Sequence, residues 1–206
     1  MIYVLPGMGA DSTMYRDDWR TLEQCAFLHW PAFAGEKSLH AIAEKIVNEA
    51  GIADGSTVVG SSLGGMVACE IARIRKLRGL ILIGSAIRNA EISGILATLH
   101  PLADYAPLEF LLKAAGSLPH ELTEMFSRGQ ADFIRGACRA IFKWNGLDES
   151  LITPRGIHGR WDRVIYPPAK VDKLLDGGHL IAWTHPKECV EFVRAGVSDE
   201  KSTRRI

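Results

Sequence analysis

The feature that most constrains this chain is the point where a run of β-branched residues at 57–59 changes abruptly into residues 60–65 (GSSLGG). This segment places Ser62 between two glycines in the pattern Gly-x-Ser-x-Gly. The β-branched residues before it are typical of a buried strand, and residues 63–75 (LGGMVACEIARIR) are typical of a helix. We therefore predict a sharp strand-to-helix turn with a serine at its apex.

Ser62 is the candidate nucleophile of this turn. A residue at such an apex adopts strained backbone angles, and its neighbours two positions away must be very small, because a Cβ there would collide with the opposing limb. Gly60 and Gly64 meet this requirement for Ser62. For Ser61, the bulky Val59 would occupy one of the two positions. The alternative is a glycine-rich turn that only packs a helix against a sheet, since five-residue patterns also occur by chance.

Size and charge favour one globular domain. The chain has 206 residues, of which 47% are hydrophobic, so it is long enough to bury a core. Lys plus Arg and Asp plus Glu both number 24, and the formal net charge is zero. We therefore expect neither a nucleic-acid nor a membrane partner.

The cysteines and the N-terminus favour a cytoplasmic protein. The short apolar run at residues 1–5 meets Pro6 directly and is too short for a signal peptide, and no later stretch reaches transmembrane length. The cysteines have no metal or disulfide spacing, so reduced and mostly buried thiols are expected. They are Cys25, Cys69, Cys138 and Cys189.

Short apolar runs alternate with helical patterns through most of the chain. One helix is expected to begin after Ser38 as its N-cap and to stop at Gly51, and a last one is expected to start near Pro186. Short strands separated by helices predict an α/β fold, with a mainly parallel sheet of about six strands and helices on both faces. The predicted strands are residues 2–5, 25–30, 57–60, 80–83, those around 157, and 171–175.

The interval between residues 87 and 152 breaks this alternation. It has helical periodicity without a convincing strand, and its first part is too long for a simple crossover. We predict a single domain, residues 1–206, with a helical lid at about 87–130 inserted after the fourth strand. The later part is expected to pack as an ordinary helix. Its apolar stripe consists of Phe133, Ile134, Ala137, Ile141 and Trp144.

His179 is the candidate base that would take the proton of Ser62. An activated serine needs such a base, and a third group to orient it. Of the seven histidines, His179 follows the last predicted strand within residues 176–180 (DGGHL), where two glycines let the backbone bend back over the sheet. The alternative is a solvated loop histidine.

Asp162 is the candidate acid that would orient His179. It lies in residues 157–165 (IHGRWDRVI), at the end of the strand that precedes the histidine. The alternative is a surface ion pair of Asp162 with Arg160 or Arg163. Glu91 and Asp148 are weaker candidates, and Glu91 is kept because the acid can also follow the fourth strand.

Backbone amides are the candidate donors for the negative oxygen that forms when a carbonyl is attacked. One is the amide of Leu63, directly after the nucleophile at a helix N-terminus. The other is expected in residues 6–9 (PGMG), with Met8 as first choice and Gly9 as second, although a tight turn has the same composition. This loop is not a phosphate-binding loop, because it lacks a third glycine and a Lys-Ser/Thr pair.

The order and placement of these segments resemble the α/β-hydrolase family. The segments that carry the resemblance are residues 5–9 (LPGMG), 60–65 (GSSLGG), 158–162 (HGRWD) and 177–179 (GGH), which together span most of the chain. The resemblance implies that Ser62 attacks the substrate, that His179 shuttles the proton and that Asp162 orients His179. It also implies that the amides of Met8 and Leu63 bind the oxyanion.

The chain departs from the family pattern in two ways. It begins at what would be the third strand of the family, so a compact member without the antiparallel leading strands is expected. Pro6 stands where a histidine is common, so the contacts of that histidine in the oxyanion loop are missing.

These observations predict a serine hydrolase that cleaves a small, hydrophobic ester or thioester through an acyl-serine, without a metal or cofactor. The expected partner is a small acyl substrate, and no oligomeric state is predicted. Lactone or C–C bond cleavage would suit the same triad. The alternative is a ligand-binding protein on a hydrolase scaffold, with slow or incidental hydrolysis. An apolar wall for the acyl group is expected from Leu96, Leu99, Leu102, Tyr105, Phe110 and Leu111.

Overall fold

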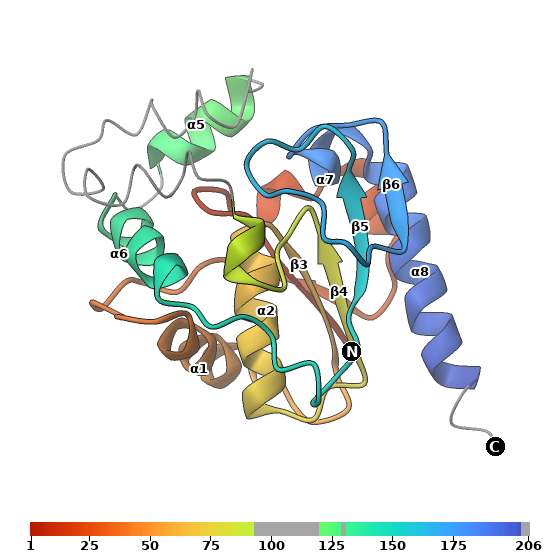
Figure 1. Cartoon of the computed structure of the whole chain (residues 1–206), viewed down its shortest axis with the longest axis horizontal. Helices are drawn as coiled ribbons and strands as arrows, with labels where there is room; N and C mark the ends of the chain where they lie inside the picture. Colours follow the sequence, from red (N-terminus) through yellow and green to blue (C-terminus); the bar gives the residue numbers. More distant parts are fainter. Residues whose placement is uncertain (93–119, 129–130, 203–206) are drawn as a thin grey trace.

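One parallel sheet forms the centre of the molecule (Figure 1). The computed structural model describes residues 1–92, 120–128 and 131–202. Its strands are β1 (Ile2–Leu5), β2 (Cys25–Phe27), β3 (Thr57–Ser61), β4 (Gly79–Ile83), β5 (Arg155–Gly159) and β6 (Lys173–Leu175). Their order is β2-β1-β3-β4-β5-β6, and all neighbouring pairs are parallel. The predicted α/β fold with a sheet of about six strands is therefore confirmed.

The strand order places a switch point between β1 and β3. From β1 the chain first adds β2 on one side, and it then adds β3 to β6 in succession on the other side. In open parallel sheets, ligands bind outside the carboxyl ends of the strands at such a point. The loop after β1 and the loop after β3 are therefore the first places to look for a site.

The two faces of the sheet carry separate apolar cores, because successive side chains of a strand point to opposite faces. In β3, for example, Val58 belongs to one core and Val59 to the other. The first core is covered by α1 (Leu39–Ala50), α2 (Leu63–Ile74) and α6 (Ala131–Phe142). The second core is covered by the short helices η1 (Ser12–Met14), η2 (Asp17–Thr21) and α7 (Ile181–Thr184) and by α8 (Pro186–Ser202). Figure 1 shows α1 and α2 on one side of the sheet and α8 on the other.

Local signals explain where several elements begin and end. The Ser38 hydroxyl accepts the N–H of Ala41 at 3.1 Å, and Gly51 ends α1 in the left-handed region at φ 63°, as predicted. The second strand is shorter than the predicted 25–30. It ends at Phe27 because Pro6, which follows β1, has no N–H with which to extend the ladder.

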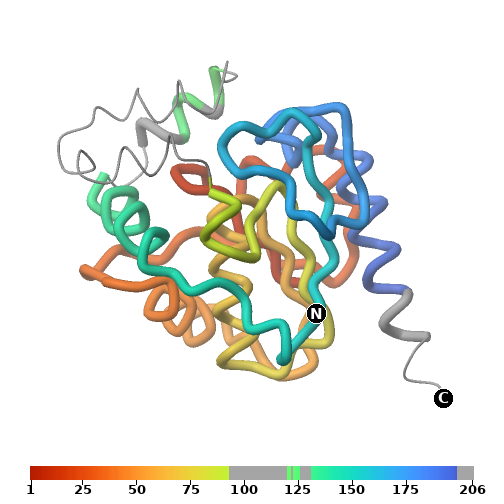
Figure 2. The backbone as a smooth tube through the Cα atoms, viewed as in Figure 1, coloured from red at the N-terminus to blue at the C-terminus, as the bar shows by residue number. Residues whose placement is uncertain are grey.

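α6 packs against α1, although the two helices are far apart in the sequence (Figure 2). Phe133 of α6 stacks edge-on against Phe33, with ring centroids 6.1 Å apart. A Cβ at Gly136 would lie only 2.5 Å from the Phe33 ring, so a glycine is needed where that ring meets α6. The Phe133–Trp144 stripe is therefore part of the core, as predicted.

A buried carboxylate ties α2 to its surroundings. Glu70 accepts hydrogen bonds from the indole of Trp144 at 2.8 Å and from Arg73 at 3.2 Å, and its other oxygen lies 3.0 Å from Nδ1 of His40. A buried charge is tolerated when its oxygens are paired in this way. These contacts join α1, α2 and the segment after α6 on the face away from α8.

The predicted lid at about 87–130 falls largely on residues 93–119, which lie outside the described residues, so it stays a prediction. Ile87 and Ile92 are buried at the edge of the first core, and Ile92 forms an antiparallel bridge with Ile165. The short helix η3 (Asn89–Glu91) lies between Ile87 and Ile92 in the sequence. On the other side of the gap, α5 (His120–Arg128) lies beyond the carboxyl ends of the strands (Figure 1). No helix in the described parts of the chain is long and apolar enough to cross a bilayer.

Candidate active site

Ser62 occupies the strained apex of the turn between β3 and α2. Its backbone angles are φ 52° and ψ −120°, a combination that a non-glycine residue adopts only at a cost. A Cβ on Gly60 would overlap the backbone of Gly64, and a Cβ on Gly64 would lie 2.5 Å from the carbonyl oxygen of Pro6. The strained apex and the two small neighbours therefore agree with the sequence prediction.

The turn is held in place from β4 and from the loop after it. The N–H of Ser62 donates to the carbonyl of Ile83 at 3.0 Å, and the buried hydroxyl of Ser85 donates to the carbonyl of Ser62 at 2.7 Å. A Cβ at Gly65 would collide with the Ser85 side chain. Only a glycine at this position lets the first turn of α2 lie so close to the Ser85 hydroxyl. Sequence reasoning missed Ser85. Its position after β4 is the one feature that distinguishes it from other serines.

The structure brings Ser62, His179 and Asp162 together, although they are far apart in the sequence. Oγ of Ser62 lies 2.9 Å from Nε2 of His179, and Nδ1 of the same ring lies 2.8 Å from Oδ2 of Asp162. A carboxylate only accepts hydrogen bonds, so Nδ1 donates to Asp162, and a ring with this one proton leaves Nε2 to accept from the Ser62 hydroxyl. This is the direction of proton transfer that activation of the serine requires.

The loops that carry His179 and Asp162 are fastened to each other. The N–H of Arg160 donates to the carbonyl of Leu175 at 2.8 Å, and the N–H of Trp161 donates to the carbonyl of Gly177 at 2.9 Å. A Cβ at Gly159 would overlap the carbonyl oxygen of Gly178, so the close approach of the two loops depends on that glycine. The loop that carries the acid and the loop that carries the base are therefore joined to each other at the carboxyl ends of β5 and β6.

Asp162 is buried and fully hydrogen-bonded. Its Oδ1 accepts the N–H groups of Val164 at 2.8 Å and Ile165 at 3.0 Å, while its Oδ2 faces His179. Burial alone would raise the pKa of this carboxyl group, but the hydrogen bonds from His158 and His179 outweigh burial and hold the pKa well below its usual range. Asp162 is therefore an anion at neutral pH.

His158 is a second histidine on the same carboxylate. Its Nε2 lies 3.0 Å from Oδ2 of Asp162 and 3.0 Å from the carbonyl oxygen of Ile165. Both partners are acceptors, so Nε2 is the protonated nitrogen and is shared between them. Sequence reasoning counted His158 among the histidines without giving it a role. Its spacing, four residues before Asp162, was the available signal.

The structure disfavours the alternatives for His179 and Asp162. The His179 side chain is only 8% exposed and that of Asp162 is 0% exposed, so neither is a solvated surface group. Arg160 pairs instead with Asp176, at 3.0 Å. Of the weaker acids, Glu91 accepts the backbone N–H of Ile87 at 2.7 Å and thereby closes its own loop.

Asp148, the remaining candidate acid, has local partners of its own. It accepts the hydroxyl of Ser150 at 2.6 Å, and it lies 3.8 Å from a guanidinium nitrogen of Arg73. The Ser150 hydroxyl lowers the pKa of this exposed carboxyl group. Asp148 is therefore occupied in a surface turn after α6.

The candidate amide donors belong to the residue after Ser62 and to a loop that lies against Ser62. Leu63 is the first residue of α2, so its N–H has no acceptor within the helix. The loop after β1 lies against the nucleophile, since a Cβ at Gly7 would be 3.7 Å from Cβ of Ser62. Gly9 takes φ 73°, and the N–H of Ala10 donates to the carbonyl of Gly7 at 3.2 Å, so residues 7–10 form a tight turn. The choice between Met8 and Gly9 as the second donor stays a prediction.

All four cysteines are free thiols, three of them buried and Cys25 half-buried. Burial raises the pKa of the Cys138 thiol to about 11 and that of Cys25 to about 12, so these thiols are protonated at neutral pH. Among residues 1–92, 120–128 and 131–202, no three His, Cys, Asp or Glu side chains are grouped so that they could hold a metal ion.

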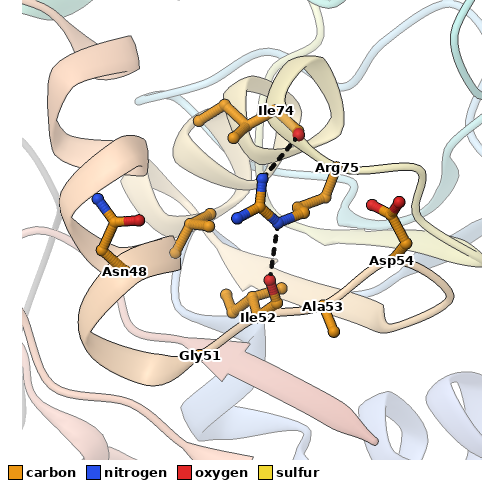
Figure 3. A pocket seen from close by; sticks show the side chains of 8 residues that line it. Asn48, Gly51, Ile52, Ala53, Asp54, Ile74 and Arg75 are labelled. Atoms are coloured by element: carbon orange, nitrogen blue, oxygen red, sulfur yellow. Dashed lines mark hydrogen bonds between the residues drawn. The ribbon is translucent and has the colours of Figure 1, made fainter.

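An open cavity of about 500 Å³ lies at the opposite end of the sheet (Figure 3). Its lining comes from the end of α1 and the end of α2, just before β3 and β4 begin. The guanidinium of Arg75 donates to the carbonyls of Ile52 and Ile74, at 3.0 and 3.1 Å (Figure 3). It therefore links the end of α2 to the loop that follows α1. This cavity is remote from Ser62, which lies at the carboxyl end of β3.

The comparison with protein families places the chain in a known class. The profile of the Alpha/beta hydrolase family matches residues 2–192. The chain belongs to the alpha/beta hydrolase family, which confirms the resemblance noted in the sequence. No curated protein matches the chain in sequence.

Solved structures share this fold at low sequence identity. A thermophilic esterase from Thermogutta terrifontis has a TM-score of 0.74 at 15% identity, covering 97% of this chain and 89% of that chain. The N-acyl homoserine lactonase AidH has a TM-score of 0.71 at 17% identity, covering 98% and 90%. The type II thioesterase BorB of the borrelidin biosynthetic cluster has a TM-score of 0.64 at 18% identity, covering 95% and 91%. At such identities the similarity shows the fold alone.

Proposed function

We propose that the protein is a serine hydrolase that cleaves a small, hydrophobic ester or thioester through an acyl-serine intermediate. The observation that carries this proposal is the continuous relay from Ser62 through His179 to Asp162, with contacts of 2.9 and 2.8 Å. The strained position of Ser62 supports it, because backbone strain of this kind is concentrated at functional sites.

Acylation begins when Oγ of Ser62 forms a bond to the carbonyl carbon and its proton passes to Nε2 of His179. The carbonyl oxygen becomes an oxyanion, which the amides of Leu63 and Met8 stabilise. The imidazolium, stabilised by the anionic Asp162, then gives the proton to the leaving alcohol or thiol as the bond to carbon breaks. No group other than side chains and amides is needed for this step.

Deacylation repeats the sequence with water as the nucleophile. His179 takes a proton from water, the resulting oxygen attacks the acyl carbon, and the proton returns to Oγ of Ser62 as the acid leaves. Water and ester are consumed, acid and alcohol are formed, and the enzyme is restored.

The activities named for solved structures with this fold favour an ester or thioester as the substrate. The neighbouring structures include an esterase, an acyl homoserine lactonase and a type II thioesterase. All three names denote cleavage of an activated acyl group, which is the reaction that the relay in this chain suits. The apolar wall expected from Leu96 to Leu111 lies outside the described residues, so the preference for a hydrophobic acyl chain rests on the sequence pattern.

Covalent labelling tests the proposal directly. A fluorophosphonate probe is expected to label Ser62 in the wild-type protein, to leave Ser62→Ala unlabelled, and to label His179→Ala only weakly. p-Nitrophenyl esters of increasing acyl length, measured beside acyl-CoA thioesters, then define the acyl preference. A folded protein that neither reacts with the probe nor turns over any ester would instead support a ligand-binding role on a hydrolase scaffold.

A further inference from the structure

We propose that Trp30 is a positioning residue of the oxyanion loop, whose indole N–H holds the carbonyl of Gly7 and thereby aims the amide of Met8 at the substrate oxygen. Trp30 does not touch the reacting atoms in this scheme. It acts through the Gly7–Met8 peptide, and the inference rests on the hydrolase function proposed above.

The first step is the hydrogen bond itself. Nε1 of Trp30 donates to the carbonyl oxygen of Gly7 at 3.0 Å. The C=O of Gly7 and the N–H of Met8 belong to one planar trans peptide, so they point in opposite directions. A donor that fixes the Gly7 oxygen therefore also fixes the direction of the Met8 N–H.

The second step is the place of this peptide beside the nucleophile. A Cβ built on Gly7 would lie 3.7 Å from Cβ of Ser62, so the loop and the serine are in close proximity. The preceding part of the loop is fastened separately, because the hydroxyl of Tyr15 donates to the carbonyl of Leu5 at 2.7 Å. Among the residues that the structure describes, the carbonyl of Gly7 has the Ala10 N–H, at 3.2 Å, as its one donor besides the indole.

The third step is the rigidity of Trp30. Its ring lies against Phe133 of α6, with centroids 4.9 Å apart and planes inclined by 37°. Phe133 is buried in the first core, so the indole is supported on its face while its edge reaches the loop. Met8 also contacts this helix, since the thiol of Cys138 lies 3.8 Å from the Met8 sulfur. The indole that holds Gly7 and the side chain of Met8 therefore both contact α6.

The test separates the N–H group from the bulk of the ring. Trp30→Phe keeps an aromatic ring against Phe133 and removes the donor. Replacing Trp30 by β-(3-benzothienyl)alanine, in which sulfur stands for the N–H, removes the donor with the indole shape intact. We expect kcat per fluorophosphonate-titrated site to fall about 10-fold or more in both variants, which is part of the rate lost when an oxyanion donor is removed completely. KM is expected to stay within about 2-fold of the wild-type value.

A second readout follows the oxyanion directly. A trifluoromethyl ketone forms a hemiketal oxyanion with an activated serine, so its affinity is expected to fall in both variants by the same factor as kcat. A loss of packing alone would lower the melting temperature without this matched loss. Trp144→Phe is the control, because it removes an indole hydrogen bond to Glu70 away from the loop, at 2.8 Å. It is expected to lower the melting temperature and to leave kcat unchanged below the melting transition.

Two outcomes would overturn the inference. If both Trp30 variants kept the wild-type kcat and the wild-type inhibitor affinity, Trp30 would be a packing residue alone. An equal loss of kcat in Trp144→Phe would show that the effect is not specific to the loop. Failure of the proposed function itself has a different signature, namely a wild-type protein without esterase or thioesterase turnover, or turnover that survives in Ser62→Ala.

Discussion

Nε2 of His158 lies 3.0 Å from Oδ2 of Asp162, and both side chains are almost completely buried, at 2% and 0% exposure. The same oxygen faces His179 at 2.8 Å, so one carboxylate oxygen serves two imidazole rings. The other oxygen is held by two backbone amides. Asp162 therefore has a fixed direction and a fixed charge before any substrate arrives.

His158→Leu is expected to weaken both the fold and the relay. The variant leaves Asp162 with one donor fewer and removes the side-chain donor to the Ile165 carbonyl, which costs roughly 1–3 kcal/mol in unfolding free energy. kcat is expected to fall less than in Asp162→Asn, because two backbone amides still orient the carboxylate. Urea unfolding and ester turnover measure the two effects. His158→Gln, which can donate from a similar position, is expected to recover part of both losses.

Asp162→Asn is expected to keep the fold and to lower kcat by about 10⁴-fold, as loss of the orienting carboxylate does in a Ser-His-Asp triad. Ester turnover at saturating substrate measures this, with circular dichroism as the check on folding. Glu91→Gln is the matched control, since Glu91 closes its own loop through Ile87. A nearly silent Asp162→Asn beside a crippling Glu91→Gln would reverse the assignment of the acid.

The stability of the protein is expected to fall in acid because of Asp162. The folded-state pKa of this carboxyl group is held below its unfolded value of about 3.9, so its contribution is fully present above that value and is lost as pH falls toward the folded pKa. Urea unfolding between about pH 6 and pH 2 should show a steeper loss for the wild type than for Asp162→Asn, which cannot titrate. Parallel slopes would contradict the lowered pKa.

Gly159→Ala is expected to push the acid loop and the base loop apart. The new Cβ would overlap the carbonyl oxygens of Gly177 and Gly178, and backbone atoms cannot give way cheaply. Both the melting temperature and kcat should fall. Gly178→Ala is the matched control in the same loop, because its Cβ would meet nothing within 4 Å. Equal effects of the two substitutions would show that the close approach is not the cause.

The strain at Ser62 is expected to appear as stability once the serine is replaced. At φ 52° an alanine keeps the steric cost and a glycine does not. Ser62→Gly should therefore be more stable than Ser62→Ala by about 1 kcal/mol, with both inactive. Thermal unfolding of the two variants makes this comparison without reference to any substrate. A less stable glycine variant would argue against a strained apex.

The sequence was sufficient where one short segment determines its own geometry. The glycines around Ser62 predicted a strained apex, and the cap residues Ser38 and Gly51 predicted both ends of α1. Apolar runs separated by helical patterns predicted the parallel sheet, because short strands joined by helical crossovers lie parallel to one another.

The rest depended on contacts between segments that no local pattern reveals. The end of β2 depends on the neighbouring Pro6, and the role of His158 depends on where the loop to Asp162 turns back. The indole of Trp30 reaches Gly7 from a segment more than twenty residues later, so only the folded chain brings the two together. Such pairings are set by tertiary packing, and a spacing such as the one from His158 to Asp162 does not by itself reveal them.

The loops after β5 and β6 share backbone hydrogen bonds, whereas Ser62 is attached to β3 and α2. The imidazole and its carboxylate are therefore held by one pair of linked loops, and the Ser62–His179 hydrogen bond is the contact of the relay that joins them to a different segment. Inhibitors or substitutions that lengthen this contact would disconnect the hydroxyl while leaving the histidine and aspartate coupled, so spectroscopic signals from that pair would persist in an inactive protein.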